Sequence, residues 1–450
     1  MFSSAYAKDP AMLTIEQAAD AVRRGELSPV ELTSACLHKV DELDPELHAF
    51  ITVTGHAALE EAFVAEREIA AGNWRGPLHG IPIALKDLLD TPGIRTTGAS
   101  HVYESRIPDA EAEVVRRLRA AGAVIIGKTN LHEFAYGCSS VVTAFGDVHN
   151  PHAPERIAGG SSSGSAVAVA TGMCIAAIGT DTAGSIRLPA AFCGVVGLKP
   201  TYELVSRDGV IPLAPSYDHV GPITRTVTDA EIVLRAIADE EYERTDRTGT
   251  TFRVGVARDY FFEHMDPEIK AITEAALSRI EAASGKLTVV NINVDEDRTI
   301  HKAEAFAYHA PLLEQNSDLY QPQTLERILS GSSITPAEYG QACMRLRRIR
   351  AGARTLFHHV DVIITPTCPV DAPVLADLKA DEQNLRAREV EMLRNTRPFN
   401  VLGLPSITIP CGRTSVGLPV GIQFAAAMGQ DARLLEFASA LERLLNVPSR

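Results

Sequence analysis

Residues 156–172 read RIAGGSSSGSAVAVATG, with four serines and three glycines in the seven positions 159–165, followed by small apolar residues. A loop of this composition can bind a phosphate or hold a reactive hydroxyl group. Gly160–Gly164 fits the G-x-S-x-G pattern, which places a reactive serine between a strand and a helix. The preceding residues, 149–158, contain two prolines and show no strand pattern. We therefore interpret this match as coincidental.

A second pattern lies upstream, where Gly122–Thr129 fits the G-x-x-x-x-G-K-T sequence of a nucleotide-binding loop. Its variable positions are Ala-Val-Ile-Ile, which favour a strand over a tight anion-binding turn. The residues before it, AEVVRRLRAAG, predict a helix that ends at Gly122. A helix followed by a strand is the reverse of the order that the motif needs. We expect a buried strand here, and a nucleotide-binding protein is the less favoured alternative.

The bulk composition indicates a soluble globular protein. The chain has 450 residues, 45% hydrophobic and 22% charged, with a formal net charge of −14. This charge argues against nucleic acid or an anionic membrane as the main partner. The basic run 345–350 is accordingly interpreted as a solvated helix face rather than an RNA-binding segment.

The seven cysteines are scattered and form no C-x-x-C pair. They predict neither a disulfide framework nor a zinc site, and they favour a reducing cytoplasm. We expect no bound metal, because the histidines lack H-E-x-x-H spacing. The N-terminus shows no basic region followed by an apolar stretch, so no signal peptide is expected.

Short β-branched runs alternate with helical patterns, which is typical of an α/β protein whose sheet is covered on both faces. Amphipathic helices are expected over about 13–70, the second opened by Ser28-Pro29, and a helical cap or insertion over about 300–358. We expect one domain over 1–450, with an exposed connection at 240–250. The expected strands are 81–87, 123–129, 174–180, 194–200, 253–259, 287–294, 360–367, 406–411 and 419–425.

Three stretches, GPLHGIPIALKDLLD (76–90), AGGSSSGSAVAVATG (158–172) and GTDTAGSIRLPAAFCGVVGLKPT (179–201), resemble the amidase signature family of serine hydrolases. The resemblance is strongest over about 76–222. It implies a single mixed sheet surrounded by helices, an acyl-enzyme mechanism and no cofactor. It also implies a Ser–cis-Ser–Lys triad, which falls on Lys86, Ser161 and Ser185.

The residues themselves agree with these implied roles. Ser185 follows a strand and a glycine-containing turn, so the backbone N–H groups of Thr182, Ala183, Gly184 and Ser185 can form an oxyanion hole. Lys86 ends an apolar strand, and as a base it needs a pKa near 7–8, which burial can supply. Alternation along the strand should direct Asp87 to the opposite face.

Other residues near the motifs are given supporting or structural roles. Asp181 and Arg187 flank the nucleophile and are expected to hold its loop as a pair. Tyr136, Gly137 and Cys138, in the HEFAYGCSS segment with Phe134, resemble the family's substrate pocket. Four further residues are expected to be structural, with Ser162 or Ser163 capping a helix, Cys193 buried, and Asp218-His219 outside the catalytic set.

Two functions within the resemblance remain open. The first is a stand-alone amidase, a monomer or homodimer, that cleaves neutral aryl amides, with carbamates as a second candidate class of substrate. The second is the glutaminase component of a tRNA-dependent amidotransferase. We favour the first, because Leu188 stands where the glutaminase component has glutamine and because segment 393–397 lacks its acidic residue. The expected partner is then only a small-molecule amide or carbamate, without nucleic acid or membrane.

Overall fold

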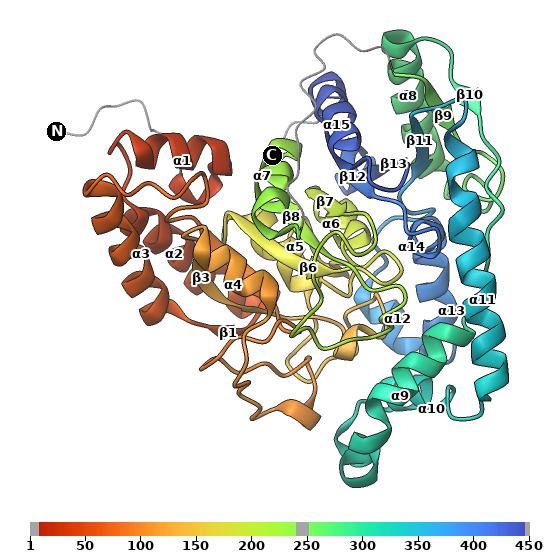
Figure 1. Ribbon diagram of the computed structural model, residues 1–450, viewed down its shortest axis with the longest axis horizontal. Coiled ribbons are helices and arrows are strands. Elements are labelled where there is room, and N and C mark those ends of the chain that lie inside the picture. The colour runs from red at the N-terminus through yellow and green to blue at the C-terminus, as the bar shows by residue number, and fades with distance from the viewer. Residues whose placement is uncertain (1–8, 240–251, 446–450) are drawn as a thin grey trace.

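The computed structural model describes residues 9–239 and 252–445, and one sheet runs through all of it (Figure 1). The sheet has eleven strands in the order β1-β3-β2-β6-β8-β7-β12-β13-β11-β9-β10, with both parallel and antiparallel neighbours. This confirms the predicted α/β class with a mixed sheet. The strands are β1 (Phe50–Val53), β2 (Pro82–Lys86), β3 (Val124–Thr129), β6 (Ala176–Thr180), β7 (Val196–Lys199), β8 (Val220–Thr224), β9 (Val254–Val256), β10 (Thr288–Val289), β11 (Val362–Pro366), β12 (Ser406–Arg413) and β13 (Pro419–Ala426).

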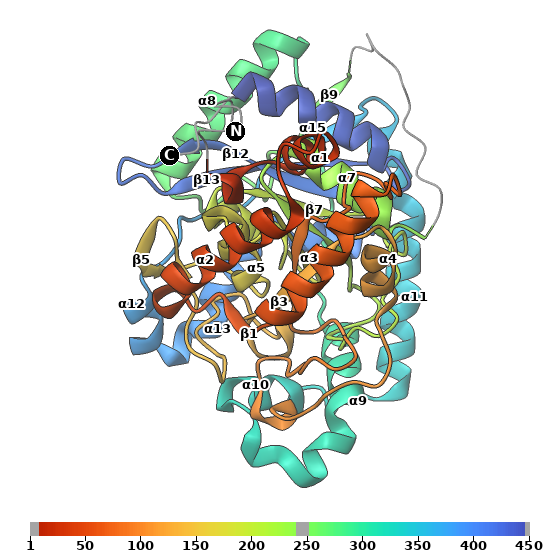
Figure 2. The ribbon, with the colours of Figure 1, turned by 90° about the vertical axis from the view of Figure 1, so that its left-hand side faces the viewer.

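Helices surround this sheet. Figure 1 shows α1–α3 at one end of the molecule and α9–α11 at the opposite side, and Figure 2 shows α2 beside α3 as seen from the first end. The helices are α1 (Ile15–Arg23), α2 (Pro29–Leu47), α3 (Gly55–Ala70), α4 (Glu113–Ala120), α5 (Ser163–Thr171), α6 (Arg187–Cys193), α7 (Val227–Ile237), α8 (Pro267–Ser284), α9 (Thr299–Asn316), α10 (Pro322–Leu329), α11 (Pro336–Ala353), α12 (Leu375–Ala380), α13 (Glu382–Met392), α14 (Arg397–Val401) and α15 (Asp431–Leu445). No described helix is both long and apolar enough to cross a membrane.

Most expected elements are present. Ser28 caps α2 through its side chain, with Glu31 completing the capping box. The helical segment 300–358 forms α9, α10 and α11. Gly122–Thr129 is a helix end followed by buried strand β3, as predicted. The expected connection at 240–250 lies outside the described residues.

Four strand expectations were incomplete. β1 was missed, because only helices were expected over 13–70, and it pairs with β3 at the edge of the sheet. β8 was missed because Gly221 and Pro222 lower its strand propensity, although it pairs with β6 and β7 inside the sheet. The expected strand 287–294 shortens to β10, at the sheet edge. Residues 149–158, where no strand was expected, form a separate hairpin of β4 (His149–Asn150) and β5 (Ala153–Ile157).

Helix α5 lies in the middle of the molecule and positions the serine-rich loop that precedes it. Its residues 163–169 are all buried, and it packs against β2, β3, β6 and β8. Gly164 allows this close packing, because a Cβ there would lie 2.1 Å from the carbonyl oxygen of Ala49. The small side chains of α5 therefore set the depth at which the loop 159–162 meets the sheet.

Candidate active site

Three segments that are far apart in the sequence meet at the carboxyl end of β2 and β6. Lys86 ends β2, Ser161 precedes α5, and Ser185 follows β6, which pairs in parallel with β2. The Lys86 Nζ donates hydrogen bonds of 2.7 Å to the Ser161 Oγ and to the Thr180 Oγ1. The backbone N–H of Ser162 donates to the carbonyl oxygen of Ser185 at 3.1 Å. The structure thus joins Lys86 and Ser161 by a side-chain hydrogen bond, and joins the Ser161 loop to the Ser185 turn through the backbone.

The electrostatic environment of Lys86 favours the neutral amine. Its side chain is completely buried, and burial lowers its pKa to about 7, even though Asp181 and Asp218 raise it. The neighbouring Asp87 carboxylate is used elsewhere: it accepts from Thr97 and forms a 3.2 Å ion pair with Lys128. Successive side chains of an extended chain point to opposite faces, so the Asp87 carboxylate points away from the Lys86 amine. Lys86 can therefore be neutral near neutral pH and accept a proton.

The loop that carries Ser161 is fixed by its backbone. The Gly160–Ser161 peptide bond is cis. The carbonyl oxygen of Ser161 accepts from the His132 N–H at 3.2 Å, and that of Gly159 accepts from the Ser140 Oγ at 3.1 Å. Both partners belong to segment 132–140, which therefore supports the serine-rich loop.

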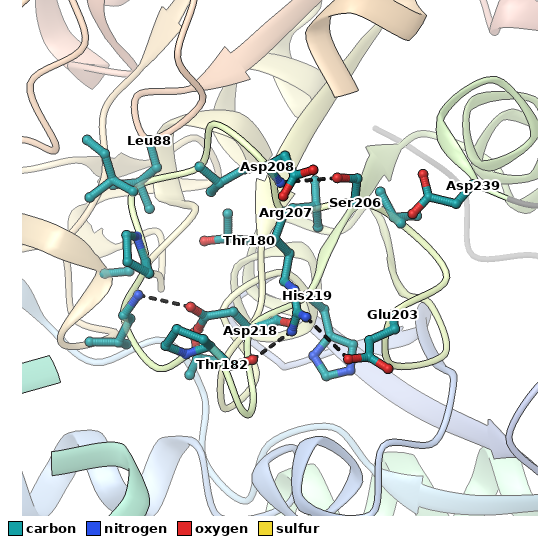
Figure 3. Close-up of a pocket in the computed structure, with 18 residues that line it drawn as sticks. Leu88, Thr180, Thr182, Glu203, Ser206, Arg207, Asp208, Asp218, His219 and Asp239 are labelled. Atoms are coloured by element: carbon teal, nitrogen blue, oxygen red, sulfur yellow. Dashed lines mark hydrogen bonds and ion pairs between the residues drawn. The ribbon is translucent and has the colours of Figure 1, made fainter. Parts of the chain in front are cut away.

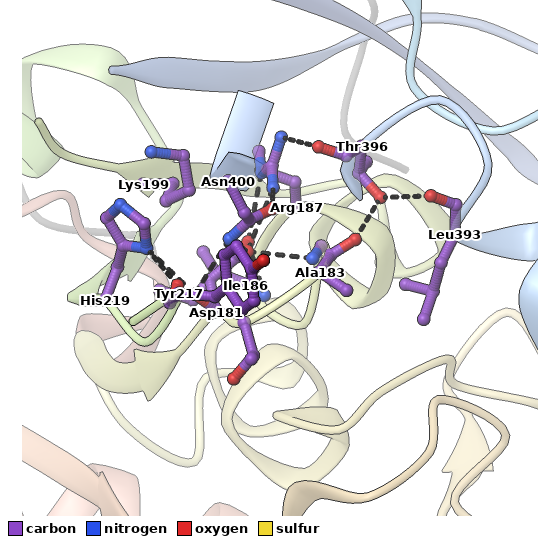
Figure 4. Close-up of polar contacts among 12 residues, drawn as sticks. Asp181, Ala183, Ile186, Arg187, Lys199, Tyr217, His219, Leu393, Thr396 and Asn400 are labelled. Atoms are coloured by element: carbon purple, nitrogen blue, oxygen red, sulfur yellow. Dashed lines mark hydrogen bonds and ion pairs between the residues drawn. The ribbon is translucent and has the colours of Figure 1, made fainter. Parts of the chain in front are cut away.

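The turn that carries Ser185 is held by a buried ion pair between Asp181 and Arg187 (Figure 4). Arg187 donates from Nη2 to Asp181 Oδ1 at 2.9 Å and from Nε to Oδ2 at 3.0 Å. The same carboxylate accepts from the backbone N–H groups of Gly184 and Ile186, on either side of Ser185. Burial alone would raise the pKa of Asp181, but Arg187 and Asn400 hold it below its ordinary value. The carboxylate therefore stays charged and shapes the turn.

Arg187 also ties the turn to the C-terminal part of the chain. Its Nη1 donates to the Thr396 carbonyl oxygen at 2.9 Å and to Gln423 Oε1 at 2.6 Å, and its Nη2 donates to Asn400 Oδ1 at 2.6 Å. These partners come from α14, the residue before it, and β13. A charged side chain with this many partners is satisfied without water.

The expected set of four oxyanion donors needs one correction. The N–H of Gly184 donates to Asp181 at 2.8 Å and is therefore already used. The backbone N–H groups of Thr182, Ala183 and Ser185 make no such bond within the described residues. Gly184 has φ +132°, and a Cβ there would lie 2.0 Å from the Thr396 Oγ1, so glycine is required. Ala183 has no positive φ, and its methyl group is accommodated without backbone strain.

Only some of the residues expected to line the space in front of Ser185 do so. Tyr136 and Gly137 line it, but Cys138 does not, because its Sγ and backbone N–H face Glu389 on α13. Phe134, in the same segment, packs against Tyr103 and two other rings instead. The other lining residues are Ala135, Thr182, Ala183, Leu213, Arg298, His301, Arg386 and Leu393. Arg298, His301 and Arg386 were not expected, since they lie far from the motifs and carry no local signal, whereas Leu393 belongs to segment 393–397, which was considered from the sequence.

Two larger cavities flank this narrow space, whose volume is about 20 Å³. One, of about 440 Å³, lies around Thr180, Thr182, Asp218 and His219 (Figure 3) and shares Ala135, Thr182 and Leu213 with the narrow space. The other, of about 360 Å³, shares Arg298 and Leu393 with it. Asp218 fixes Thr182 between the first cavity and Ser185, by accepting from Thr182 Oγ1 at 2.6 Å.

The other residues considered from the sequence, Ser162, Cys193 and His219, are buried and contact the backbone or the core. Ser162 stands at the N-cap of α5, but its Oγ bonds to the backbone of Thr180 rather than to the helix. Cys193 is buried, and burial raises the pKa of its thiol. His219 Nδ1 faces the backbone carbonyl oxygens of Asp181 and Tyr217, so it does not pair with the neighbouring Asp218 carboxylate.

The residues used to choose between the two functions lie only partly at this site: Leu393 lines the narrow space, and Arg394 and Arg397 line the adjoining cavity of about 360 Å³. Leu188 is completely buried in an apolar cluster with Phe192 and Met392. Arg394 donates to Tyr260 and Glu263, and Arg397 donates to the carbonyl oxygens of Asp295 and Asp297. Leu188, Arg394 and Arg397 are not among the residues that line the space in front of Ser185.

Comparison with known proteins extends these observations. The family model described as Amidase matches residues 31–435. The A-type subunit of glutamyl-tRNA(Gln) amidotransferase from Thermosynechococcus vestitus is 38% identical, over 96% of this chain and 98% of that protein. The protein of the same name from a Synechococcus species is 39% identical, over 95% and 96%. A crystal structure described as an amidase superposes with a TM-score of 0.87 at 32% identity, over 96% of this chain and 99% of that one.

These relatives overturn two expectations. The predicted stand-alone amidase for aryl amides or carbamates is wrong, since these and further curated relatives, over nearly the full chain, are named as the A-type subunit of an amidotransferase. The predicted partners are wrong for the same reason: that name describes one component of an enzyme acting on a glutamyl-tRNA, whereas we expected a monomer or homodimer without nucleic acid. Leu188 misled because it is buried in an apolar cluster away from the space at Ser185, and segment 393–397 misled because its two arginines are bonded to Tyr260, Glu263, Asp295 and Asp297.

The buried pair that shapes the turn makes a first prediction. In Asp181→Asn, Arg187 keeps its charge but loses the carboxylate, and an uncompensated buried charge costs about 3–5 kcal/mol of stability. We expect a matching fall in the free energy of unfolding by urea, and at least a tenfold fall in kcat for the fraction that folds. Asp377→Asn, at an exposed position of α12, is the control. Equal stability of the two variants would contradict the role given to Asp181.

Proposed function

The chain belongs to the amidase family, and from this premise we propose that it hydrolyses the side-chain amide of glutamine as the A-type subunit of a tRNA-dependent amidotransferase. One observation carries the proposal: the match to A-type subunits extends over 95–97% of this chain and 96–98% of theirs. The reaction releases ammonia and leaves glutamate. The catalytic roles follow from the geometry at Lys86, Ser161 and Ser185.

In the proposed mechanism, neutral Lys86 accepts a proton from Ser161, and Ser161 accepts one from Ser185. The Ser185 Oγ then attacks the amide carbon, and the carbon–oxygen bond forms as the carbonyl becomes an oxyanion. The same groups return a proton to the leaving nitrogen when the carbon–nitrogen bond breaks. Water, activated by the same route, cleaves the acyl-enzyme.

The oxyanion would be stabilised by backbone N–H groups of the turn. Thr182, Ala183 and Ser185 supply the available donors, and a single donor of this kind is typically worth about 3–4 kcal/mol in the transition state. The Asp181 carboxylate, which binds the other two N–H groups of the turn, keeps these donors in place. Asp181 is therefore a positioning residue in this mechanism.

The proton relay predicts a specific pattern among the serines. We expect Ser185→Ala to lower kcat by at least 10³-fold, and Lys86→Ala and Ser161→Ala by a similar factor, because the three groups act as a unit. A fluorophosphonate should label only the peptide that contains Ser185, as read by mass spectrometry. Ser163→Ala is the matched control, because Ser163 makes only a 3.5 Å contact with the Asn130 carbonyl oxygen. Labelling at Ser162 or Cys193 would refute the assignment.

The pKa of Lys86 predicts the pH dependence of activity. Because burial lowers this pKa to about 7, Lys86 is protonated below pH 7 and cannot accept the proton from Ser161. We expect kcat/KM to rise as the pH increases through about 7 and to level off at alkaline pH. The profile should be measured with one amide substrate at constant ionic strength. A rate that is independent of pH between 6 and 9 would contradict a lysine base.

The substrate is tested by ammonia release from glutamine labelled with ¹⁵N in the side-chain amide. We expect kcat/KM for glutamine to exceed that for 4-nitroacetanilide by at least tenfold, a difference of about 1.4 kcal/mol in transition-state stabilisation. The assay is run with the chain alone and with any proteins that copurify with it. Preference for the anilide in both preparations would refute the proposed function.

A further inference from the structure

Asp218 carries a buried carboxylate that the proton relay does not use. It lies in the loop before β8 and lines the cavity of about 440 Å³ that adjoins the narrow space at Ser185 (Figure 3). The residue is 9% exposed, and among the described residues its carboxylate forms no ion pair. A buried carboxylate without a contacting cation is costly unless hydrogen bonds compensate for the lost water.

The register of the sheet places Asp218 opposite Thr182. β6 and β8 pair in antiparallel fashion as far as Thr180. Beyond it, Asp181 and His219 continue the ladder by exchanging backbone hydrogen bonds of 2.9 and 3.1 Å. Thr182 and Asp218 come next, and a side-chain bond joins them: the Thr182 Oγ1 donates to Asp218 Oδ1 at 2.6 Å. This contact therefore follows from the pairing of the two strands.

The carboxylate is also fixed from its own loop. The backbone N–H of Leu213 donates to Oδ2 at 3.0 Å, and that of Ala214 donates to Oδ1 at 3.2 Å and to Oδ2 at 3.0 Å. The N–H of Asp218 donates back to the Ala214 carbonyl oxygen at 2.9 Å. Every one of these contacts to the carboxylate comes from a donor, which is the pattern of an ionised group. Asp218 is thus a charged anchor whose position does not depend on Thr182.

Thr182 joins this anchor to the turn that carries Ser185. The N–H groups of Thr182 and Ala183 belong to consecutive peptides, and both are among the donors left free in that turn within the described residues. A fixed Thr182 side chain limits the rotation of the backbone on both sides of its Cα, and so fixes the direction of both N–H groups. Donors that are aimed in advance need no reorganisation when the oxyanion forms.

The negative charge of Asp218 also acts on Lys86. Burial lowers the pKa of Lys86, and the carboxylates of Asp181 and Asp218 act in the opposite direction. The Asp181 carboxylate is paired with Arg187, whereas the described contacts of the Asp218 carboxylate are neutral donors. His132, which also lies near Lys86, is neutral because burial lowers its pKa to about 3.

The other charged groups near these residues have partners elsewhere. Asp87 pairs with Lys128 at 3.2 Å, and Arg207, whose charge lies near Asp218, pairs with Glu203 at 3.6 Å. Asp218 therefore keeps most of its negative charge available to the Lys86 amine. This charge matters most when Lys86 has accepted a proton and become an ammonium ion in a buried position.

We propose that Asp218 is a positioning residue for amide hydrolysis at Ser185: it holds two oxyanion donors through Thr182, and its charge stabilises the ammonium that forms on Lys86. The inference rests on the proposed mechanism and adds to it a residue outside the proton relay. Both effects are realised in the transition state rather than in substrate binding. Loss of either should therefore lower kcat more than it changes KM.

A pair of substitutions at Thr182 tests the positioning effect. Thr182→Val removes the hydroxyl and leaves the charge of Asp218, so we expect kcat for glutamine to fall at least tenfold while KM changes less than threefold. Thr182→Ser keeps the hydroxyl and should be at least fivefold more active than Thr182→Val. This pair decides the inference if a substitution at Asp218 itself prevents folding.

Asp218→Asn tests the effect of the charge. We expect the rise of kcat/KM with pH to move to lower pH by about half a unit or more, because Lys86 loses an anion that favours its protonated form. Lower stability alone would not move this midpoint. Asp208→Asn, at an exposed position that lines the same cavity, is the matched control and should keep the wild-type kcat and midpoint.

Labelling of Ser185 by a fluorophosphonate gives a readout that needs no amide, because its phosphonyl oxygen takes the place of the oxyanion. The labelling rate should fall at least tenfold in Thr182→Val, and its pH midpoint should move in Asp218→Asn but not in Asp208→Asn. Wild-type kcat and labelling rate in Thr182→Val, or an unshifted midpoint in Asp218→Asn, would overturn the inference. These changes in labelling without ammonia release from glutamine would refute the proposed function and leave the role of Asp218 standing.

Discussion

The site depends on one constraint: the amine of Lys86 is buried without a carboxylate in direct contact. A charged lysine in that position would be very costly, so burial shifts the balance to the neutral form at a pKa of about 7. Two features of the fold preserve this condition. Strand β2 directs the Asp87 carboxylate to the other face, towards Lys128. Within the part of the chain that the structure describes, the Lys86 amine then bonds to two hydroxyl groups, those of Ser161 and Thr180.

The buried carboxylate of Asp181, in contrast, keeps its charge. Asp181 remains ionised because Arg187, Asn400 and backbone N–H groups surround it. Lys86 and Asp181 are thus both buried and ionisable, yet their surroundings move their pKa values in the direction that each role needs. Asp181 shapes the turn that carries Ser185, and in the proposed mechanism Lys86 accepts the proton. Because the two groups have different hydrogen-bond partners, Lys86 can be neutral while Asp181 stays ionised in the same small region.

The substrate side of the site is built from another part of the chain. Helices α9 and α13 begin more than a hundred residues after Ser185, and together with Arg298, the residue before α9, they bring His301 and Arg386 to the space beside Ser185. The motifs thus supply the chemistry, and the later helices supply the charge that a substrate meets. This division explains how chains with the same serines and lysine can differ in the amides that they hydrolyse.

The sequence by itself determined the α/β class and most of the strands, and its motifs predicted the catalytic roles of Lys86, Ser161 and Ser185. It could do so because strand periodicity and long motifs are local properties of the chain. It failed at β8, where Gly221 and Pro222 hide a strand that its neighbours in the sheet hold in place. It also failed in the choice of function, since the sequence did not show that Leu188 is buried in an apolar cluster or which residues of segment 393–397 line the site. Only the tertiary structure decided that Gly184 donates to Asp181, that Cys138 faces Glu389, and that Arg298 lines the site. These are contacts between residues far apart in the chain or details of a single turn, and they exist only once packing has fixed which groups meet.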